Sequence, residues 1–391
     1  MKKDLNVFIL IFLVLLIVFE INLLSFANQN NEEKTKFTPF YLGIGDDYIK
    51  QGKYEEAIQA FEKAIQEEQN ESYAYFQIGH CKGNLGLYRE AIEYFKRAVD
   101  LSPALKEKVY SALAFCYFIL QEYKESIEYI NKVIELDKDS VDIINYELLG
   151  NSYQALGNYS EAIKIYRKYL NIKPNEISVL KSLVDCYKYT ENSLGAIDCL
   201  KNILKLEPEN FLSYYNLGIH YFILEEYVKA IESLKQVIRI KPDHIGAYSL
   251  MSEIYLLLER YTPAVEICEK ALKIEPENIE IRLKLGTALM GRKSYREAIN
   301  IMVDTIKLDP DCSEAYILWG NCNFQLKDFS SAKNLFKKAI KIDKKNAAAH
   351  YFLGLCYVVE NNHDLAINQY KILKEMDEKL ADKLFEFIFK K

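Results

Sequence analysis

Small and apolar side chains recur along the chain with a period close to 34 residues. One small residue marks each repeat, at Ala57, Ala91, Ser126, Ala162, Ala196, Ala230, Ala264, Ala298, Ala332 and Ala366. Apolar or small residues also lie 16, 13, 12 and 9 positions before this reference residue, and 4 and 7 positions after it. This is the spacing of one face of a helix, found twice per repeat. Each repeat is therefore predicted to be two helices joined by a short turn, such as residues 51–54 or 156–159.

Glycine, tyrosine and proline keep fixed places within the repeat. Tyrosine recurs 16, 9 and 3 positions before the reference, and proline recurs 12 positions after it, where it ends the second helix. The residue 12 positions before the reference is small, which predicts that another side chain approaches it closely. It is a glycine in seven repeats, at Gly45, Gly79, Gly150, Gly218, Gly286, Gly320 and Gly354, and Ala114, Val184 or Ser252 in the other three.

A single hairpin of 34 residues cannot bury its apolar face, so consecutive hairpins must stack into one continuous core. Two irregularities interrupt the period. One extra residue lies between Ala91 and Ser126, and two lie between Ser126 and Ala162. Irregular stacking is therefore expected on both sides of the third hairpin. In the fifth hairpin, Ser193 replaces the tyrosine that usually lies three positions before the reference.

The repeat resembles the tetratricopeptide repeat. The resemblance is carried by units such as residues 146–153 (Tyr-Glu-Leu-Leu-Gly-Asn-Ser-Tyr), followed by residues 159–162 (Tyr-Ser-Glu-Ala) and Pro174. It implies an all-α fold, a right-handed superhelical solenoid of about ten helical hairpins. The ten repeats would occupy residues 38–380, and residues 381–391 would form a C-terminal capping helix.

The N-terminal segment has the features of a targeting sequence. Lys2 and Lys3 precede an uninterrupted apolar run over residues 7–19, and Ser25 and Ala27 suit signal peptidase. Residues 1–27 are predicted to be a signal peptide cut before Asn28 or, if uncleaved, an N-terminal membrane anchor. A buried core helix is the less favoured alternative.

Residues 28–37 would form a polar linker. No Lys or Arg lies between Asp4 and Glu33, so both favoured interpretations place the repeats outside the cytoplasm. The protein is expected to be periplasmic, extracellular or tethered to the membrane.

Composition and motifs exclude several function classes. A net charge of −6 disfavours nucleic acid as a partner, since that affinity depends on clustered basic residues. The five histidines have no second histidine three or four residues away, and no Cys-x-x-Cys spacing occurs, so no metal site is expected. Phosphate-binding and dinucleotide glycine motifs and a G-x-S-x-G elbow are also missing from the sequence. We therefore expect no cofactor and no catalytic residues.

The cysteines follow the repeat as well. Those that lie ten positions before the reference are predicted to be buried free thiols: Cys81, Cys116, Cys186, Cys322 and Cys356. Cys268 lies at the core position four after the reference. Only Cys199 and Cys312 are kept as candidates for redox chemistry or cross-linking.

A second face of each first helix is unusually apolar. It comprises the residues 15, 11, 8 and 7 positions before the reference, and the family resemblance implies that it lines a concave surface. Its candidate partner-binding residues are Phe76, Phe115, Phe118, Tyr189, Tyr215, Phe222, Leu256, Phe324 and Tyr351. Exposed aromatic patches mark recognition surfaces, so we expect a protein partner, bound through a peptide segment or a helix.

Two alternatives stay open. Strong curvature of the array would bury part of this face against neighbouring units. The chain would also fit a structural subunit of a cell-envelope assembly, with permanent contacts through its convex face or its ends.

Overall fold

The computed structural model describes residues 40–68, 70–136 and 142–389. These residues form helices and no strands, which confirms the predicted all-α class. The predicted signal peptide or anchor and the linker lie outside the described residues. None of the described helices is long and apolar enough to cross a membrane.

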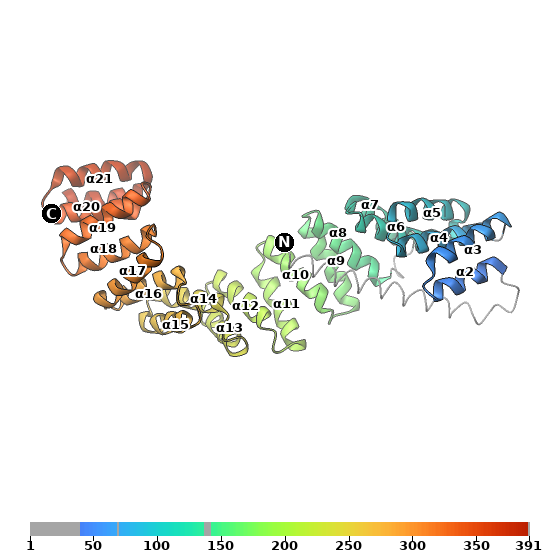
Figure 1. Ribbon diagram of the computed structural model, residues 1–391, viewed down its shortest axis with the longest axis horizontal. Coiled ribbons are helices and arrows are strands. Elements are labelled where there is room, and N and C mark those ends of the chain that lie inside the picture. Colours follow the sequence, from blue (N-terminus) through green and yellow to red (C-terminus); the bar gives the residue numbers. More distant parts are fainter. Residues whose placement is uncertain (1–39, 69, 137–141, 390–391) are drawn as a thin grey trace. The chain divides into compact units, whose positions relative to one another are not determined.

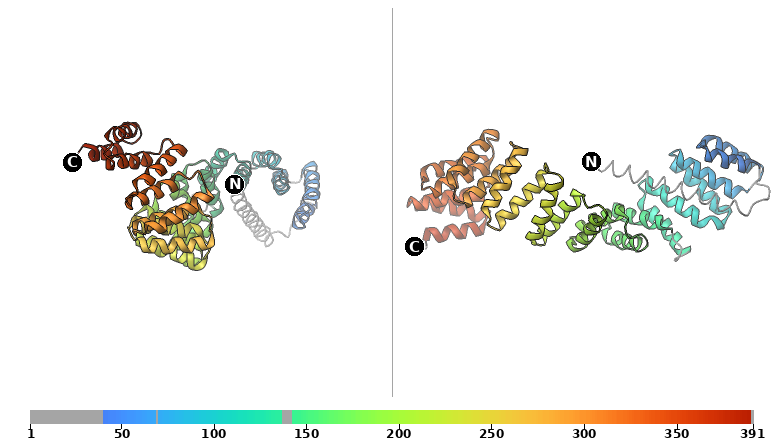
Figure 2. Two further views of the ribbon diagram at one scale, coloured as in Figure 1. Left: turned by 60° about the vertical axis from the view of Figure 1, so that its left-hand side comes forward. Right: turned by 90° about the horizontal axis from the view of Figure 1, so that it is seen from below.

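The chain divides into two compact units, residues 1–174 and 175–391. In each unit the helices follow one another as packed hairpins (Figures 1 and 2). The hairpins of the first unit are α2 (Phe40–Lys50) with α3 (Tyr54–Gln66), α4 (Glu71–Asn84) with α5 (Tyr88–Leu101), α6 (Lys106–Ile119) with α7 (Tyr123–Leu136), and α8 (Ile143–Ala155) with α9 (Tyr159–Ile172).

The second unit contains six hairpins and one further helix. They are α10 (Ile177–Tyr189) with α11 (Ser193–Leu206), α12 (Phe211–Ile223) with α13 (Tyr227–Ile240), α14 (Ile245–Leu257) with α15 (Tyr261–Ile274), α16 (Ile279–Gly291) with α17 (Tyr295–Leu308), α18 (Ser313–Gln325) with α19 (Phe329–Ile342), α20 (Ala347–Val359) with α21 (His363–Met376), and the terminal α22 (Glu378–Phe389). About ten hairpins were predicted, and this prediction is confirmed.

The irregularity before the third hairpin is a short 3₁₀ helix, η1 (Pro103–Leu105), which leads directly into α6. The extra residues after that hairpin fall in a stretch of which residues 137–141 lie outside the described part. The division into compact units comes later, after Pro174, between the fourth and fifth hairpins.

In most hairpins a large side chain of the second helix packs on the small residue of the first. A Cβ atom added at Gly45 would lie 2.6 Å from the Phe61 ring, and one at Gly150 would lie 2.4 Å from the Tyr166 ring. Real Cβ atoms do not come so close to other atoms, so the close approach predicted from the sequence is confirmed. Where Ser252 replaces the glycine, the facing residue is the small Cys268.

Several successive first helices contact one another within each unit. α4 touches α6 and α6 touches α8, while α12, α14, α16, α18 and α20 form a continuous series. No comparable contact joins successive second helices in the described parts of the chain. The first helices are therefore closer together and line the inner side of each stack.

The turn between the two helices has one conformation throughout. Its residue five positions before the reference always has positive φ. In α12 and α13, for example, the Glu225 N–H donates to the Phe222 carbonyl at 2.9 Å, and the Glu226 N–H donates to the Tyr221 carbonyl at 2.8 Å. These bonds satisfy the last carbonyl groups of the first helix.

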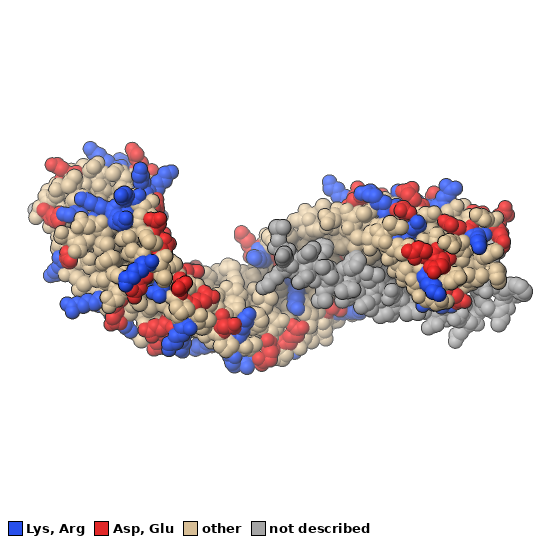
Figure 3. All heavy atoms as spheres, viewed as in Figure 1, with Lys and Arg blue, Asp and Glu red and all other residues tan. Residues whose placement is uncertain are grey.

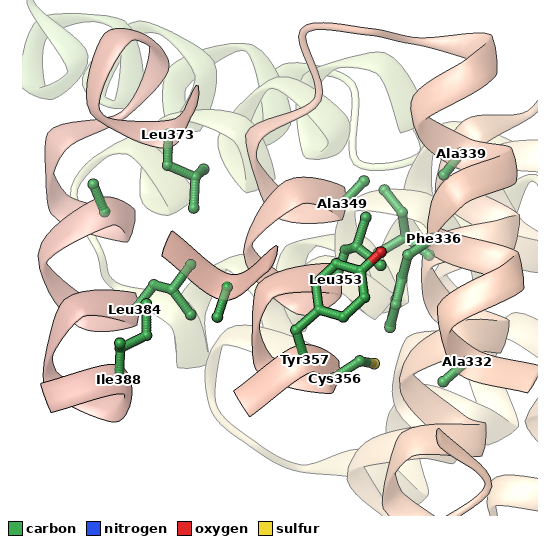
Figure 4. Packing of buried hydrophobic residues seen from close by; sticks show 13 residues of the cluster. Ala332, Phe336, Ala339, Ala349, Leu353, Cys356, Tyr357, Leu373, Leu384 and Ile388 are labelled. Carbon is green, nitrogen blue, oxygen red and sulfur yellow. The ribbon is translucent and has the colours of Figure 1, made fainter. Parts of the chain in front are cut away.

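The terminal helix α22 covers the last hairpin. It begins three residues before the predicted capping segment and buries Ala381, Leu384 and Ile388 in one cluster with Phe336, Leu353 and Leu373 (Figure 4). Three of its aromatic side chains stay exposed, Phe385, Phe387 and Phe389. One face of α22 therefore covers the core of the last hairpin, and its other faces expose aromatic side chains.

Candidate functional site

The nine predicted partner-binding residues differ widely in exposure. Tyr189, the last residue of α10, is 63% exposed. Phe118 is buried, with 7% of its surface exposed. The other seven are half-buried: Phe76, Phe115, Tyr215, Phe222, Leu256, Phe324 and Tyr351.

The expectation that Phe118 lies outside the core is wrong. Its ring packs edge-on against Tyr123, with centroids 5.5 Å apart, and it belongs to a buried cluster with Ile130 and Leu148. Phe118 lies eight positions before the reference residue of its repeat, and Tyr123, at the start of the second helix, lies three positions before the same reference residue. The same contact holds Phe222 against Tyr227 at 6.0 Å. Some aromatic side chains of this face therefore pack within their own hairpin and stabilise it.

The fifth hairpin lacks this aromatic pair. Lys188 and Ser193 occupy the two positions, and the buried Ser193 hydroxyl lies 3.2 Å from Nδ1 of His220 on the next hairpin. Burial, and then the positive charge of Lys188, lower the pKa of His220. The serine that departs from the repeat pattern thus makes a polar contact between hairpins.

Besides Tyr189, three aliphatic side chains of the inner face are strongly exposed. Ile223 is 59% exposed, Leu257 is 56% exposed and Val359 is 46% exposed. Each is the last residue of its first helix and is equivalent to Tyr189, seven positions before the reference. All three belong to the face predicted from the sequence, but the list of candidate binding residues included only Tyr189 from this position.

Polar groups bridge α14 and α16 on the same side of the second unit. The Lys284 ammonium donates to the Ser249 hydroxyl at 2.7 Å and to Glu280 at 2.8 Å, and it lies 3.3 Å from Glu253. Hydrogen bonds from Lys284 and then from Ser249 lower the pKa of Glu280. The half-buried Lys284 ammonium is thus surrounded by one hydroxyl group and two carboxylates.

The inner side of the first unit is polar near its start. Asp46 accepts hydrogen bonds from the Tyr73 hydroxyl at 2.9 Å and from Nε2 of Gln77 at 3.2 Å, while burial raises its pKa. Burial lowers the pKa of His80 to about 4. A cavity of about 30 Å³ beside His80 and Phe115 is large enough for water.

The described residues contain no group of three His, Cys, Asp or Glu side chains placed to hold a metal ion. All eight cysteines are buried and none forms a disulfide, which confirms the buried thiols predicted from the repeat. Cys199 and Cys312 are only 8% and 6% exposed. Burial raises the pKa of Cys81, Cys116 and Cys186 to about 12, so these thiols stay protonated at neutral pH.

Charged side chains of both signs are interspersed over the visible face of the molecule (Figure 3). Such a surface offers no large basic area to a nucleic-acid backbone on that face. The inner side is distinguished by exposed apolar side chains. Three of them, Tyr189, Ile223 and Leu257, end three consecutive first helices. We call these three residues the ladder.

Models of the tetratricopeptide repeat match residues 145–176, 211–244, 255–318 and 323–381. A model of the C-terminal ARM domain of tetratricopeptide repeat protein 21 matches residues 21–145. A repeat-containing protein of Methanocaldococcus jannaschii is 29% identical over 152 residues, which are 37% of this chain and 26% of that protein. The match thus spans about a quarter of that relative's length.

Solved structures also resemble the chain. The C-terminal part of a tetratricopeptide repeat protein from Cytophaga hutchinsonii has a TM-score of 0.50 at 17% identity, covering 62% of this chain and 98% of that one. YrrB, described as having an unusual peptide-binding site, has a TM-score of 0.39 at 21% identity, covering 49% of this chain and 100% of that one. At 17% identity, the likeness to the Cytophaga hutchinsonii protein supports the fold alone.

Proposed function

The chain belongs to the tetratricopeptide repeat family, and we propose that it is a non-catalytic scaffold that holds a peptide segment or a helix of another protein. Members of this family are generally scaffolds for protein–protein interaction. The partner would lie on the inner side of the second unit, across the first helices.

The ladder is the observation that carries this proposal. Tyr189, Ile223 and Leu257 are each more than half exposed, although each ends a helix that packs most of its other apolar residues. Folding of the hairpins does not require large apolar side chains there, because Gly291 and Gln325 occupy the same position in α16 and α18. Apolar groups exposed at the same position of consecutive first helices, of which α12 and α14 are in contact, favour contact with another protein.

We also propose that the protein is exported, on the evidence of its N-terminal sequence. Lys2 and Lys3, the apolar run that follows them and the small residues Ser25 and Ala27 support translocation of the repeats. The partner would then be found outside the cytoplasm. Mass spectrometry of the mature chain tests this: a chain that begins at Asn28 was cleaved, and an intact Met1 on a membrane-bound protein indicates an anchor.

A second candidate function is a structural subunit of an envelope assembly. The exposed aromatic side chains of α22 favour it, because Phe385, Phe387 and Phe389 are 41%, 58% and 54% exposed. Such residues at the end of an array suit a permanent contact with a neighbouring subunit. In that case the inner side of the second unit would not be the main interface.

Cross-linked affinity capture from native membranes tests the two functions. The inner-side variant is Tyr189→Asp with Leu257→Asp, and the control is Val228→Asp, since Val228 is 68% exposed on the second helix α13. Phe118 is unsuitable, because Asp at this buried position would unfold the hairpin. Circular dichroism verifies that each variant is helical.

A partner that is captured by the wild type and the control, and lost in the inner-side variant, supports the scaffold. Capture that survives the inner-side variant refutes it. If such capture is then lost with Phe387→Asp, the structural-subunit function is supported.

A further inference from the structure

A row of charged residues accompanies the ladder at the turns of the second unit. Glu191, Glu225 and Glu259 each follow a ladder residue by two positions, and all three are exposed. Their φ angles are 55°, 58° and 54°, the left-handed conformation of this turn. Because the turn is the same in every hairpin, these three carboxylates occupy equivalent places beside the three apolar side chains.

The charge at this turn position changes in blocks along the chain. In the first unit it is neutral throughout, at Gly52, Gly86, Gln121 and Gly157. In the second unit the order is three acidic, two basic and one neutral residue: Glu191, Glu225, Glu259, Lys293, Lys327 and Asn361. The acidic block coincides with the ladder and ends where Gly291 interrupts it.

Folding gives no reason for glutamate at these turns. Glycine adopts positive φ without steric cost and is used in three turns of the first unit. None of the three glutamates forms an ion pair with another described residue, whereas the adjacent Glu226 pairs with Lys229. Lys188 and Arg260, the basic residues nearest in sequence to Glu191 and Glu259, are likewise in no ion pair within the described chain.

We propose that the ladder and the three glutamates dock a basic amphipathic helix of a partner protein. Contacting helices such as α12 and α14 lie about 8–10 Å apart. Two turns of an α-helix advance by about 10 Å, so apolar residues recurring every seventh position would match successive ladder residues. Lys or Arg beside these apolar residues would meet the carboxylates. This inference rests on the proposed scaffold function and specifies the chemistry of its partner.

Two synthetic helical peptides test the proposal with the full-length protein. Both carry leucine at every seventh position; lysine flanks the leucines in one peptide, and glutamate flanks them in the other. Fluorescence anisotropy at low salt measures their binding. We expect the lysine peptide to bind at least about tenfold more tightly than the glutamate peptide, and added salt to reduce the difference.

Variants separate the ladder from its charges. Glu225→Lys with Glu259→Lys should weaken binding of the lysine peptide by roughly tenfold, and Lys293 and Lys327 show that lysine fits this turn. Ile223→Ser with Leu257→Ser should weaken both peptides. The matched control is Glu266→Lys with Glu269→Lys, which makes the same charge change on exposed positions of α15 and should have little effect.

Equal affinity for the two peptides overturns the proposal, as does tighter binding of the glutamate peptide. A control variant that weakens binding as much as the turn variant also overturns it, because the attraction would then be a general charge effect. These failures are distinct from failure of the scaffold function. If the inner-side variant still abolishes capture of the native partner, the scaffold stands and only the basic-helix assignment is lost.

Discussion

Replacement of Gly150 by alanine tests how the hairpins close. The added Cβ would lie 2.4 Å from Cε1 of Tyr166, a side chain with no exposed surface. The ring cannot easily move away, since its hydroxyl lies 2.6 Å from Oδ1 of Asn151 and 2.8 Å from Oε1 of Gln154. The substitution therefore overfills a packed site.

The expected net effect is a loss of about 1–3 kcal/mol in the stability of the α8–α9 hairpin. Alanine gains about 1 kcal/mol of helix propensity over glycine. Overpacking costs about 1–3 kcal/mol, and displacement of the Tyr166 hydroxyl from its partners adds about 1 kcal/mol. The steric cost outweighs the propensity gain.

Gly286→Ala is the matched control. Its Cβ would also lie 2.4 Å from a neighbour, but that neighbour is the terminal methyl group of Met302, which can rotate away. A rescue variant combines Gly150→Ala with Tyr166→Ile, which reproduces the natural pair of Ala114 with Ile130 in the third hairpin.

Hydrogen exchange measured by mass spectrometry on peptides from α8 and α9 gives the local stability, and urea unfolding followed by circular dichroism gives the global one. We expect faster exchange in Gly150→Ala, little change in Gly286→Ala and recovery in the rescue variant. Unchanged or slower exchange in Gly150→Ala would show that the glycine is not needed for closure.

Three further expectations concern the turns, the polar cluster and the thiols. Glu225→Gly should raise the free energy of unfolding by up to about 1 kcal/mol, seen as a higher urea midpoint, because glycine adopts the positive φ of this turn without strain. Glu225→Ala should give no such gain. Hydrogen bonds from Lys284 lower the pKa of folded Glu280, so their stabilisation is present above the unfolded value near 4.5 and is lost as the pH falls through the lower folded value. Lys284→Met should therefore flatten stability against pH on the acid side, and an unchanged profile would contradict the assignment. Ellman's reagent should label the eight thiols slowly in the native protein and rapidly in denaturant, because they are buried and the pKa of Cys81 and Cys116 is raised to about 12; rapid native labelling would show an accessible thiol.

The period of the sequence was enough to predict the all-α fold, the hairpins and their close contacts. Each of these depends on residues that are neighbours in the chain or one hairpin apart, and the same spacing recurs ten times. The glycine at position 150 and the aromatic residue at position 166, for instance, must meet in any hairpin with this turn. The buried state of six of the eight cysteines followed from the same periodicity, while that of Cys199 and Cys312 did not.

Exposure on the inner face depended on tertiary contacts that the period does not encode. Phe118 and Ile223 lie at adjacent repeat positions on first helices, yet Phe118 is buried against Tyr123 while Ile223 projects from the end of α12. The bridge from Lys284 to Ser249 likewise joins two hairpins whose relative position only packing defines. The sequence by itself determined which residues form each helix and which face closes each hairpin, because local spacing dictates both. The tertiary structure alone decided which apolar residues stay open to a partner, because exposure is what the neighbouring helices leave uncovered.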